Sequence, residues 1–328
     1  MARSDLLVDL VEAASRRDDE RFKRTLNALI SEERAREHHV LADRLEEAGT
    51  NNGAVPPDRQ RLSQTSRQAA LAEVQAELGL SELVIPAPAL RACLEVVEEQ
   101  NRGDLLRAHN LEPRNRLLLA GPPGNGKTSL AGALARELFA PFFVVRYEAL
   151  IGSFLGETAG NLRRLFDFVQ TRRCLLFFDE FDAIAKERGD THDTGEIKRV
   201  VSSLLLQIDD LPSYVLVVVA TNHPELLDRA VWRRFQIRLE LPAPTVSQRV
   251  KWFQLFQSRT GMSLGLAPRT LAERLGGVSY SELRDFAEGV ARRIVLSMGE
   301  LKPRAAASEE LDLWTHRYSL SQRSDGRR

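Results

Sequence analysis

The sequence is poor in cysteine and contains no long apolar run. Cys93 and Cys174 are the two cysteines among 328 residues, so a disulfide framework is excluded and a reducing compartment is favoured. No apolar run approaches the roughly 20 residues that a helix needs to span a bilayer. The first ten residues carry Asp5 and Asp9 and lack the apolar region of a secretory signal. We therefore expect a cytoplasmic protein without a membrane anchor.

The chain also lacks an excess of charge of either sign. Lysine and arginine together number 46, as do aspartate and glutamate, so the formal net charge at pH 7 is +0. This balance argues against a dedicated nucleic-acid-binding protein, which would carry a strongly basic surface. Hydrophobic residues make up 43% and charged residues 28% of the chain. Both values are near the globular average, and the length suits about two domains with additional segments.

The first 66 residues differ in character from the rest of the chain. Residues 1–48 carry apolar side chains at helical spacing and predict two or three amphipathic helices. Residues 49–66 are rich in Gly, Asn, Pro and Ser, and the pair Pro56-Pro57 blocks a helix, so this stretch is predicted to be a linker. The N-terminal helices form either a small bundle without chemistry or a module that docks a partner, and both interpretations stay open.

Short apolar runs alternate with amphipathic segments over the middle of the chain. Such alternation predicts an α/β fold in which helices cover both faces of a parallel sheet. We assign residues 67–242 to this domain, 243–302 to a small helical domain and 303–328 to a C-terminal helix or tail. The predicted strands are 116–120, 142–146, 174–178, 215–220 and 236–241. The predicted helices are 67–78, 90–100, 128–138, 159–170, 180–187, 196–208, 224–231, 246–259, 268–275 and 280–298.

The segment after the first of these strands matches the phosphate-binding loop G-x-x-x-x-G-K-[ST], or P-loop. It follows a buried strand and opens a helix, which is the context that this motif requires. Backbone N–H groups and the helix N-terminus would surround phosphates, Lys127 would reach the β- and γ-phosphates, and the Thr128 hydroxyl would bind Mg²⁺. The predicted nucleotide-binding residues here are Gly121, Pro122, Pro123, Gly124, Asn125, Gly126, Lys127, Thr128 and Ser129.

Two carboxylates end the apolar strand at 174–178. In a parallel sheet, ligands bind at the carboxyl ends of the strands, where Asp179 and Glu180 lie. Asp179 is predicted to hold Mg²⁺ directly or through water, together with Thr128. Glu180 is predicted to act as the general base that polarises the attacking water. Alone this pattern is weak, but together with the P-loop it predicts an ATPase that uses ATP and Mg²⁺.

These two motifs resemble the AAA+ ATPases, and the residues between them resemble the AAA clade within that group. In this family a loop that lines the pore of a hexamer carries an aromatic residue, a hydrophobic residue and glycine. Here the matching residues are Phe154, Leu155 and Gly156. The resemblance implies that Phe154 grips polypeptide in the pore, although Ser153 stands where relatives often have lysine.

Further segments carry the same resemblance. Asn222 matches the sensor 1 residue that orients the attacking water, and the backbone of Val84 and Ile85 matches the segment that flanks the adenine. Arg233 and Arg234 match the arginine fingers that complete the site of a neighbouring subunit, in the adjacent form typical of katanin and spastin. Members of this clade lack the sensor 2 arginine of other AAA+ proteins. We find none at the matching place and expect Arg284 to face solvent.

The resemblance implies a homo-oligomer, most simply a hexameric ring, that uses ATP hydrolysis to thread or pull on a polypeptide client. The small helical domain then acts as a lid over the nucleotide, and the N-terminal helices are a candidate docking module for a separate partner enzyme. One alternative is a nucleotide-gated scaffold that regulates a dedicated partner protein. Another is an ATPase that acts on DNA, which the balanced charge disfavours.

Overall fold

The computed structural model describes residues 25–28, 30–31, 70–146, 155–182 and 194–325. The chain divides into two compact units, Met1–Ser63 and Gln64–Arg328. In the first unit the described residues are helical. The predicted N-terminal helices and the 49–66 linker otherwise lie outside the described residues, and so does most of the helix predicted at 180–187.

The second unit contains a six-stranded sheet in the order β1-β3-β4-β5-β2-β6. All neighbouring pairs are parallel except β1 with β3. Every residue of β4 and β5 is buried, as expected for strands whose two faces are both covered. The predicted parallel α/β sheet is thereby confirmed, with the five parallel strands within two residues of their predicted bounds. The strands are β1 (Leu71–Glu73), β2 (Arg116–Ala120), β3 (Phe142–Val145), β4 (Cys174–Phe178), β5 (Val215–Thr221) and β6 (Ile237–Glu240).

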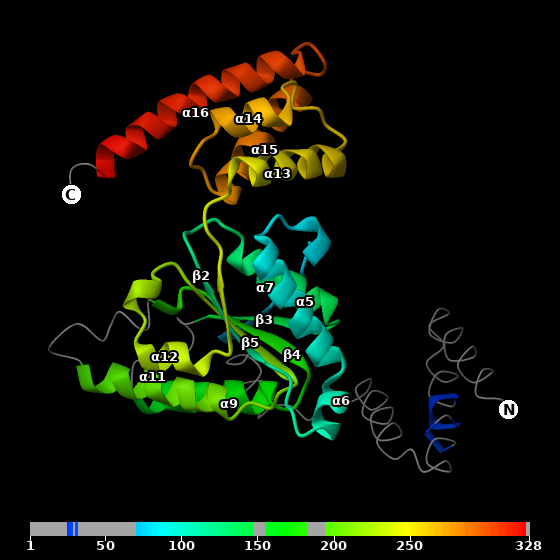
Figure 1. Cartoon of the computed structure of the whole chain (residues 1–328), viewed down its shortest axis with the longest axis vertical. Coiled ribbons are helices and arrows are strands. Elements are labelled where there is room, and N and C mark those ends of the chain that lie inside the picture. Colours follow the sequence, from blue (N-terminus) through cyan, green and yellow to red (C-terminus); the bar gives the residue numbers. More distant parts are fainter. Residues whose placement is uncertain (1–24, 29, 32–69, 147–154, 183–193, 326–328) are drawn as a thin grey trace, which may run out of the picture. The chain divides into compact units, whose positions relative to one another are not determined.

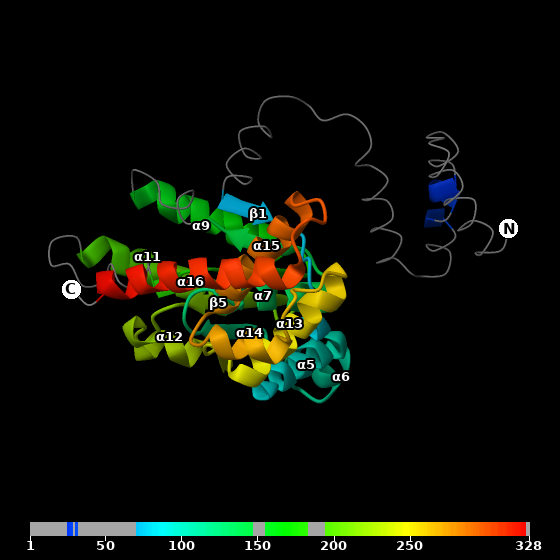
Figure 2. The ribbon, with the colours of Figure 1, turned by 90° about the horizontal axis from the view of Figure 1, so that it is seen from above.

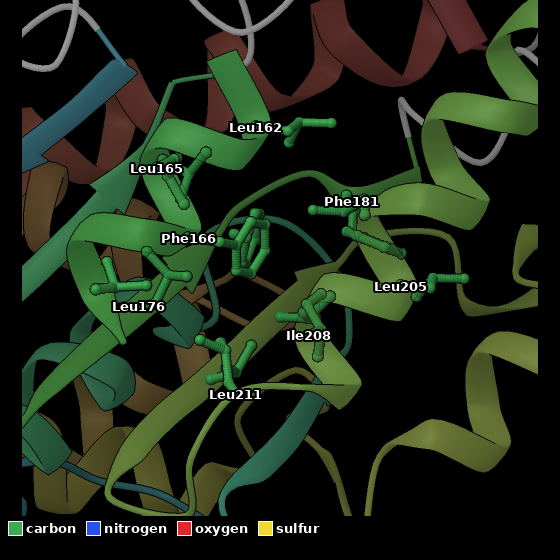
Figure 3. Close-up of a cluster of buried hydrophobic side chains, with 14 of the residues drawn as sticks. Leu162, Leu165, Phe166, Leu176, Phe181, Leu205, Ile208 and Leu211 are labelled. Carbon is green, nitrogen blue, oxygen red and sulfur yellow. The ribbon is translucent and has the colours of Figure 1, made fainter. Parts of the chain in front are cut away.

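Helices cover both faces of this sheet (Figure 1). Strand residues alternate between the two faces, so that Leu118 and Leu176 join one apolar cluster while Leu117 and Leu175 join the other. Figure 3 shows part of the first cluster, in which Phe166 packs among side chains of the covering helices. That cluster includes α9 (Leu155–Val169), α11 (Thr194–Asp209) and α12 (Arg229–Arg234), and the opposite one includes α5 (Ala87–Asn101) and α7 (Lys127–Glu137). A short helix, α6 (Gly103–Ala108), follows α5.

The helix predicted at 67–78 is wrong from residue 71 onward, because β1 forms there instead. Residues 67–69 lie outside the described residues. Leu71–Glu73 pairs antiparallel with the outer edge of β3. Two further backbone bonds extend the pairing, from the Val74 N–H to the Phe142 carbonyl (2.9 Å) and from the Arg146 N–H to the Ala70 carbonyl (3.0 Å). The pairing gives hydrogen-bond partners to backbone N–H and C=O groups at the edge of β3 that would otherwise lack them. This gain outweighs the local helix propensity of the segment.

The helix predicted at 224–231 is also wrong as a single element. The structure has a 3₁₀ turn, η2 (Pro224–Leu226), followed by α12. The Asp228 carboxylate accepts a hydrogen bond from the Ala230 N–H (3.1 Å) and so caps α12. A cap at this position starts a new helix rather than continuing the old one.

The remaining helices build one small apolar core. They are α13 (Val246–Thr260), α14 (Pro268–Arg274), α15 (Tyr280–Leu296) and α16 (Pro303–Asp325). Phe253 and Phe286 pack edge to face at its centre. Ala306 and Leu311 of α16 belong to the same cluster, and α16 lies beside α15 (Figure 1 and Figure 2). The predicted helical C-terminal part is confirmed, and α16 shares its core.

Both cysteines lie in the interior of the α/β part. Cys93 of α5 is 0% exposed and Cys174 of β4 is 1% exposed. Burial raises the pKa of each thiol to about 12. Across the described ranges, no helix combines the length and the apolar character that crossing a membrane requires.

Candidate active site

The P-loop connects β2 to α7 at the carboxyl edge of the sheet. Gly126, the residue before α7, has φ = 84°, which a side chain would strain. α7 then begins at Lys127, so its first backbone N–H groups face the loop. Such free N–H groups at a helix N-terminus are a binding site for phosphate.

The Lys127 ammonium lies in the centre of this loop and is 6% exposed. It donates hydrogen bonds to the carbonyls of Gly121 (2.7 Å) and Pro122 (2.9 Å) and to the Asn222 side-chain oxygen (2.6 Å). Burial lowers the pKa of Lys127, while the charges of Asp179 and Asp182 oppose that shift. The loop therefore holds a partly desolvated cation beside its own carbonyls.

The P-loop meets the carboxylates that end β4. The Thr128 hydroxyl donates to the Asp179 carboxylate at 3.0 Å. Hydroxyl and carboxylate oxygens are the ligands that Mg²⁺ prefers, so this pair fits the ion. Glu180 is exposed next to them, and its N–H donates to the Asp179 carboxylate (2.9 Å). Its backbone has φ = 47°, which is unusual for a residue with a side chain and is typical of functional turns.

Asp182, a residue that sequence reasoning missed, positions the end of β5. Its carboxylate accepts hydrogen bonds from the Thr221 hydroxyl (2.8 Å) and the Asn222 N–H (3.1 Å). Both Asp182 and Thr221 are buried. The signal available in the sequence was a second carboxylate three residues after Asp179, at the start of the next helix. Which groups the Asp182 carboxylate binds depends on which strand lies beside it, and the fold determines that.

A cleft of about 1020 Å³ lies between the P-loop and the helical part. Most of the predicted nucleotide-binding and catalytic residues line it: Val84, Ile85, Pro123, Gly124, Asn125, Gly126, Lys127, Thr128, Ser129, Asp179, Glu180 and Asn222. From the helical part, Trp252, Phe256, Tyr280, Ser281 and Arg284 also line it. Arg284 is exposed, as we expected, and it also lies on the wall of this cleft.

One polar side chain at this loop lacks a hydrogen-bond partner. Asn125 is 2% exposed, and within the described part of the chain neither its amide nitrogen nor its oxygen is hydrogen-bonded. A buried amide without a partner is costly, and a bound polar ligand would relieve that cost. Together with the Thr128–Asp179 pair and the N–H groups of α7, this side chain fits a site for a nucleotide with its metal ion.

The two predicted arginine fingers lie in different environments. Arg234 forms an ion pair with Asp209, which also binds Arg116 at 2.6 Å, and it donates to the Leu205 carbonyl at 3.3 Å. Arg233 is exposed, and no hydrogen bond or ion pair links it to another described residue. Neither arginine lines the cleft of its own chain.

The predicted pore-loop residues are described only in part. Phe154 lies outside the described residues. The backbone of Leu155 and Gly156 forms the first turn of α9.

Comparisons with known proteins agree with this geometry. The family described as "ATPase family associated with various cellular activities (AAA)" matches residues 117–243. The AAA family ATPase y4kL of Sinorhizobium fredii is 36% identical over 289 residues, which cover 86% of this chain and 86% of that protein. The cell division cycle protein 48 homologue of Archaeoglobus fulgidus is 34% identical over 213 residues, or 63% of this chain. The peroxisomal ATPase pex6 of Schizosaccharomyces pombe is 42% identical over 134 residues, or 39% of this chain.

The last two relatives are much longer proteins. The matches cover 28% of the Archaeoglobus protein and 14% of pex6. Among solved structures, the FIGL-1 AAA domain in complex with ADP aligns with a TM-score of 0.60 over 80% of this chain and 92% of that one. Its sequence identity is 24%, so this likeness shows the fold alone.

Proposed function

Because the chain belongs to the AAA family of ATPases, we propose that it couples ATP hydrolysis to the remodelling of other proteins. ATP hydrolysis itself follows from the family. The observation that carries the ATPase part of the proposal is the Thr128–Asp179 hydrogen bond of 3.0 Å, with Glu180 beside it. It brings the P-loop and the acidic strand end to one point, where binding and hydrolysis of a nucleoside triphosphate take place together. Remodelling is supported by the similarity to relatives such as the cell division cycle protein 48 homologue.

The P-loop and Lys127 bind the phosphates of the nucleotide. The N–H groups at the start of α7 hydrogen-bond phosphate oxygens, and the Lys127 ammonium exchanges its loop carbonyls for the β- and γ-phosphates. Thr128 and Asp179 would hold Mg²⁺, which when bound offsets the charge of the phosphate oxygens. The nucleobase lies toward Val84 and Ile85, which line the same cleft.

The residues that follow β4 and β5, Glu180 and Asn222, carry out hydrolysis. The Glu180 carboxylate accepts a proton from the attacking water, and the Asn222 amide orients that water. Asp182 holds the Asn222 backbone and so fixes the amide relative to Lys127. The products are ADP and inorganic phosphate.

A second copy of the chain supplies the remaining cation. Arg233 is exposed and unpaired within the described part of the chain, so its guanidinium is available to a phosphate in a neighbouring subunit. Arg234, held by Asp209, supports the α12 segment that carries it. Arginines that act in trans on each site require a homo-oligomer, for which we propose a ring of six subunits. In such a ring Phe154 is the residue that contacts the polypeptide client.

The two buried, free cysteines fit a reducing compartment, and we propose the cytoplasm as the place of action. The client is a protein, and the N-terminal helices are the proposed site at which a partner enzyme docks.

The test combines turnover with a substrate panel. ATPase activity is measured with unfolded proteins, double-stranded DNA and native candidate partners, and unfolding of a fluorescent reporter protein is followed in parallel. Glu180→Gln should bind ATP and lose turnover, and Phe154→Ala should keep turnover and lose reporter unfolding. Stimulation by DNA alone, or unfolding that persists in Phe154→Ala, would contradict protein remodelling through a pore.

A further inference from the structure

The first turn of α15 lies directly on the P-loop. The Ser281 N–H donates a hydrogen bond to the Gly124 carbonyl at 3.0 Å. A Cβ atom on Gly124 would lie 2.1 Å from the Ser281 hydroxyl and 2.8 Å from that of Ser279, so this approach requires glycine. The helical part is therefore in contact with the loop that binds phosphate, and a side chain one turn along α15 lies near the same ligand.

One face of α15 is turned toward the cleft. Ser281, Arg284 and Glu288 all line it, and they follow each other at intervals of three and four residues, which is the spacing of one helix face. Arg284 is exposed on this face, about one helical turn from the residue that contacts Gly124. The helix thus places a guanidinium on the wall of the cleft.

The carboxylates of Glu282 and Glu288, which lie near Arg284 on α15, are already bonded to other residues. Glu282 accepts hydrogen bonds from the Ser279 N–H (2.6 Å) and hydroxyl (2.7 Å), because it closes the capping box of α15. Glu288 pairs with Arg292 at 2.7 Å. Among the described residues no hydrogen bond or ion pair engages Arg284, so its charge faces the cleft without a partner.

We propose that Arg284 binds the phosphates of the nucleotide from the helical part of its own subunit. This inference rests on the proposed nucleotide site and adds a contact that the resemblance to the AAA clade did not predict. A guanidinium presents a planar, permanently charged set of donors that matches phosphate oxygens. The nucleotide then bridges Lys127 on the sheet and Arg284 on the helices, so phosphate occupancy stabilises the docked arrangement of the helical part.

The experiment compares ligands that differ in the number of phosphates. Isothermal titration calorimetry measures ADP, AMP and adenosine binding to the wild-type chain, Arg284→Ala, Arg284→Lys and the control Arg274→Ala. Arg274 is likewise exposed and unpaired within the described residues, but it does not line the cleft. We expect Arg284→Ala to weaken ADP binding by about 10- to 100-fold, the usual effect of losing a hydrogen bond to a charged group. Adenosine affinity should stay unchanged, Arg284→Lys should lie between, and Arg274→Ala should match the wild type.

Two results would overturn the inference. ADP affinity unchanged in Arg284→Ala would show that the guanidinium does not reach the phosphates. Equal losses of affinity for ADP and for adenosine would show that Arg284 contacts the nucleoside or stabilises the fold. Melting temperatures of the variant without ligand distinguish these two roles. If the wild-type chain itself did not bind ADP, the proposed nucleotide site would be wrong, and the inference about Arg284 would be wrong as a consequence.

Discussion

The Lys127 ammonium lies 2.6 Å from the side-chain oxygen of Asn222, although 95 positions separate the two residues. β2 and β5 are parallel neighbours in which Ala120 pairs with Thr221, so the segments that follow them emerge at the same edge of the sheet. Since the Asn222 oxygen accepts from Lys127, the amide NH₂ group remains for another acceptor. The lysine that we propose binds phosphate and the amide that we propose orients water are thus joined by a hydrogen bond.

The first prediction concerns Asn222 itself. Asn222→Ala removes a preorganised donor from the reacting water, so turnover should fall by about 10²-fold. Affinity for ADP should change little, because the Lys127 ammonium is still present, and without ligand the carbonyls of Gly121 and Pro122 still hold it in the loop. Steady-state kcat and ADP titrations check both parts. A large loss of ADP affinity with normal kcat would contradict the assignment.

The second prediction concerns Asp182. Asp182→Ala leaves the buried Thr221 hydroxyl and the Asn222 N–H without their acceptor, so the free energy of unfolding should drop by about 1–3 kcal/mol. Turnover should fall as well, because Asn222 loses its anchor. Asp182→Asn keeps an acceptor oxygen and should lose less of both. Urea unfolding and kcat are the measurements, and equal effects of the two variants would show that charge matters more than the acceptor.

The third prediction separates the two arginines. Arg233→Ala should abolish most turnover without changing stability, since no described residue pairs with it. Arg234→Ala should lower the free energy of unfolding by about 1 kcal/mol or less, because it breaks the ion pair with Asp209 at a partly exposed site. Thermal unfolding and ATPase assays on both variants check this difference.

Mixing inactive variants shows whether Arg233 acts on a neighbour. Glu180→Gln keeps Arg233 but has no base, and Arg233→Ala keeps the base but lacks the arginine. If the arginine acts in trans, a mixture of the two should regain turnover that neither shows alone. No recovery in mixtures that co-assemble would remove the role proposed for Arg233.

The fourth prediction concerns the metal ion. Chelation of Mg²⁺ should stop turnover, and Thr128→Ala should raise the Mg²⁺ concentration needed for half-maximal turnover, because one oxygen of the Thr128–Asp179 pair is lost. Thr128→Ser keeps the hydroxyl and serves as the control. Turnover is titrated against Mg²⁺ at fixed ATP, and an unchanged midpoint in Thr128→Ala would exclude this hydroxyl as a ligand.

The fifth prediction uses the position of Trp252. Its ring lines the cleft and stacks on Phe256 with the ring centroids 5.4 Å apart. Trp314 packs on Phe286 in the same helical core and Trp232 packs against the cluster that covers the sheet, and neither of them lines the cleft. Adding ADP should therefore change the tryptophan fluorescence of the wild type and of Trp314→Phe, but not that of Trp252→Phe. A signal that survives in Trp252→Phe would locate the nucleotide response elsewhere.

The sequence predicted those features that depend on local pattern. The apolar runs of β2 and β4 and the glycines of the P-loop are recognisable because their neighbours in the chain determine them. β1 was predicted as a helix because its stability comes from pairing with β3, about 70 positions away. The role of Asp182 and the position of the exposed Arg284 on the cleft wall were missed for the same reason, because the fold brings Asn222 and the P-loop to them. The roles of Phe154 and of the N-terminal helices stay predictions.

The two buried thiols have a practical consequence for experiments on this chain. Thiolate is the form that reacts with maleimides and oxidants, and at neutral pH neither Cys93 nor Cys174 provides it, since each thiol has a pKa of about 12. A single cysteine introduced on the surface, for example in place of Arg274, could carry a fluorescent dye without first replacing the native pair. Together with a second dye attached to the α/β part, such a label would report how the helical part moves during a cycle of turnover.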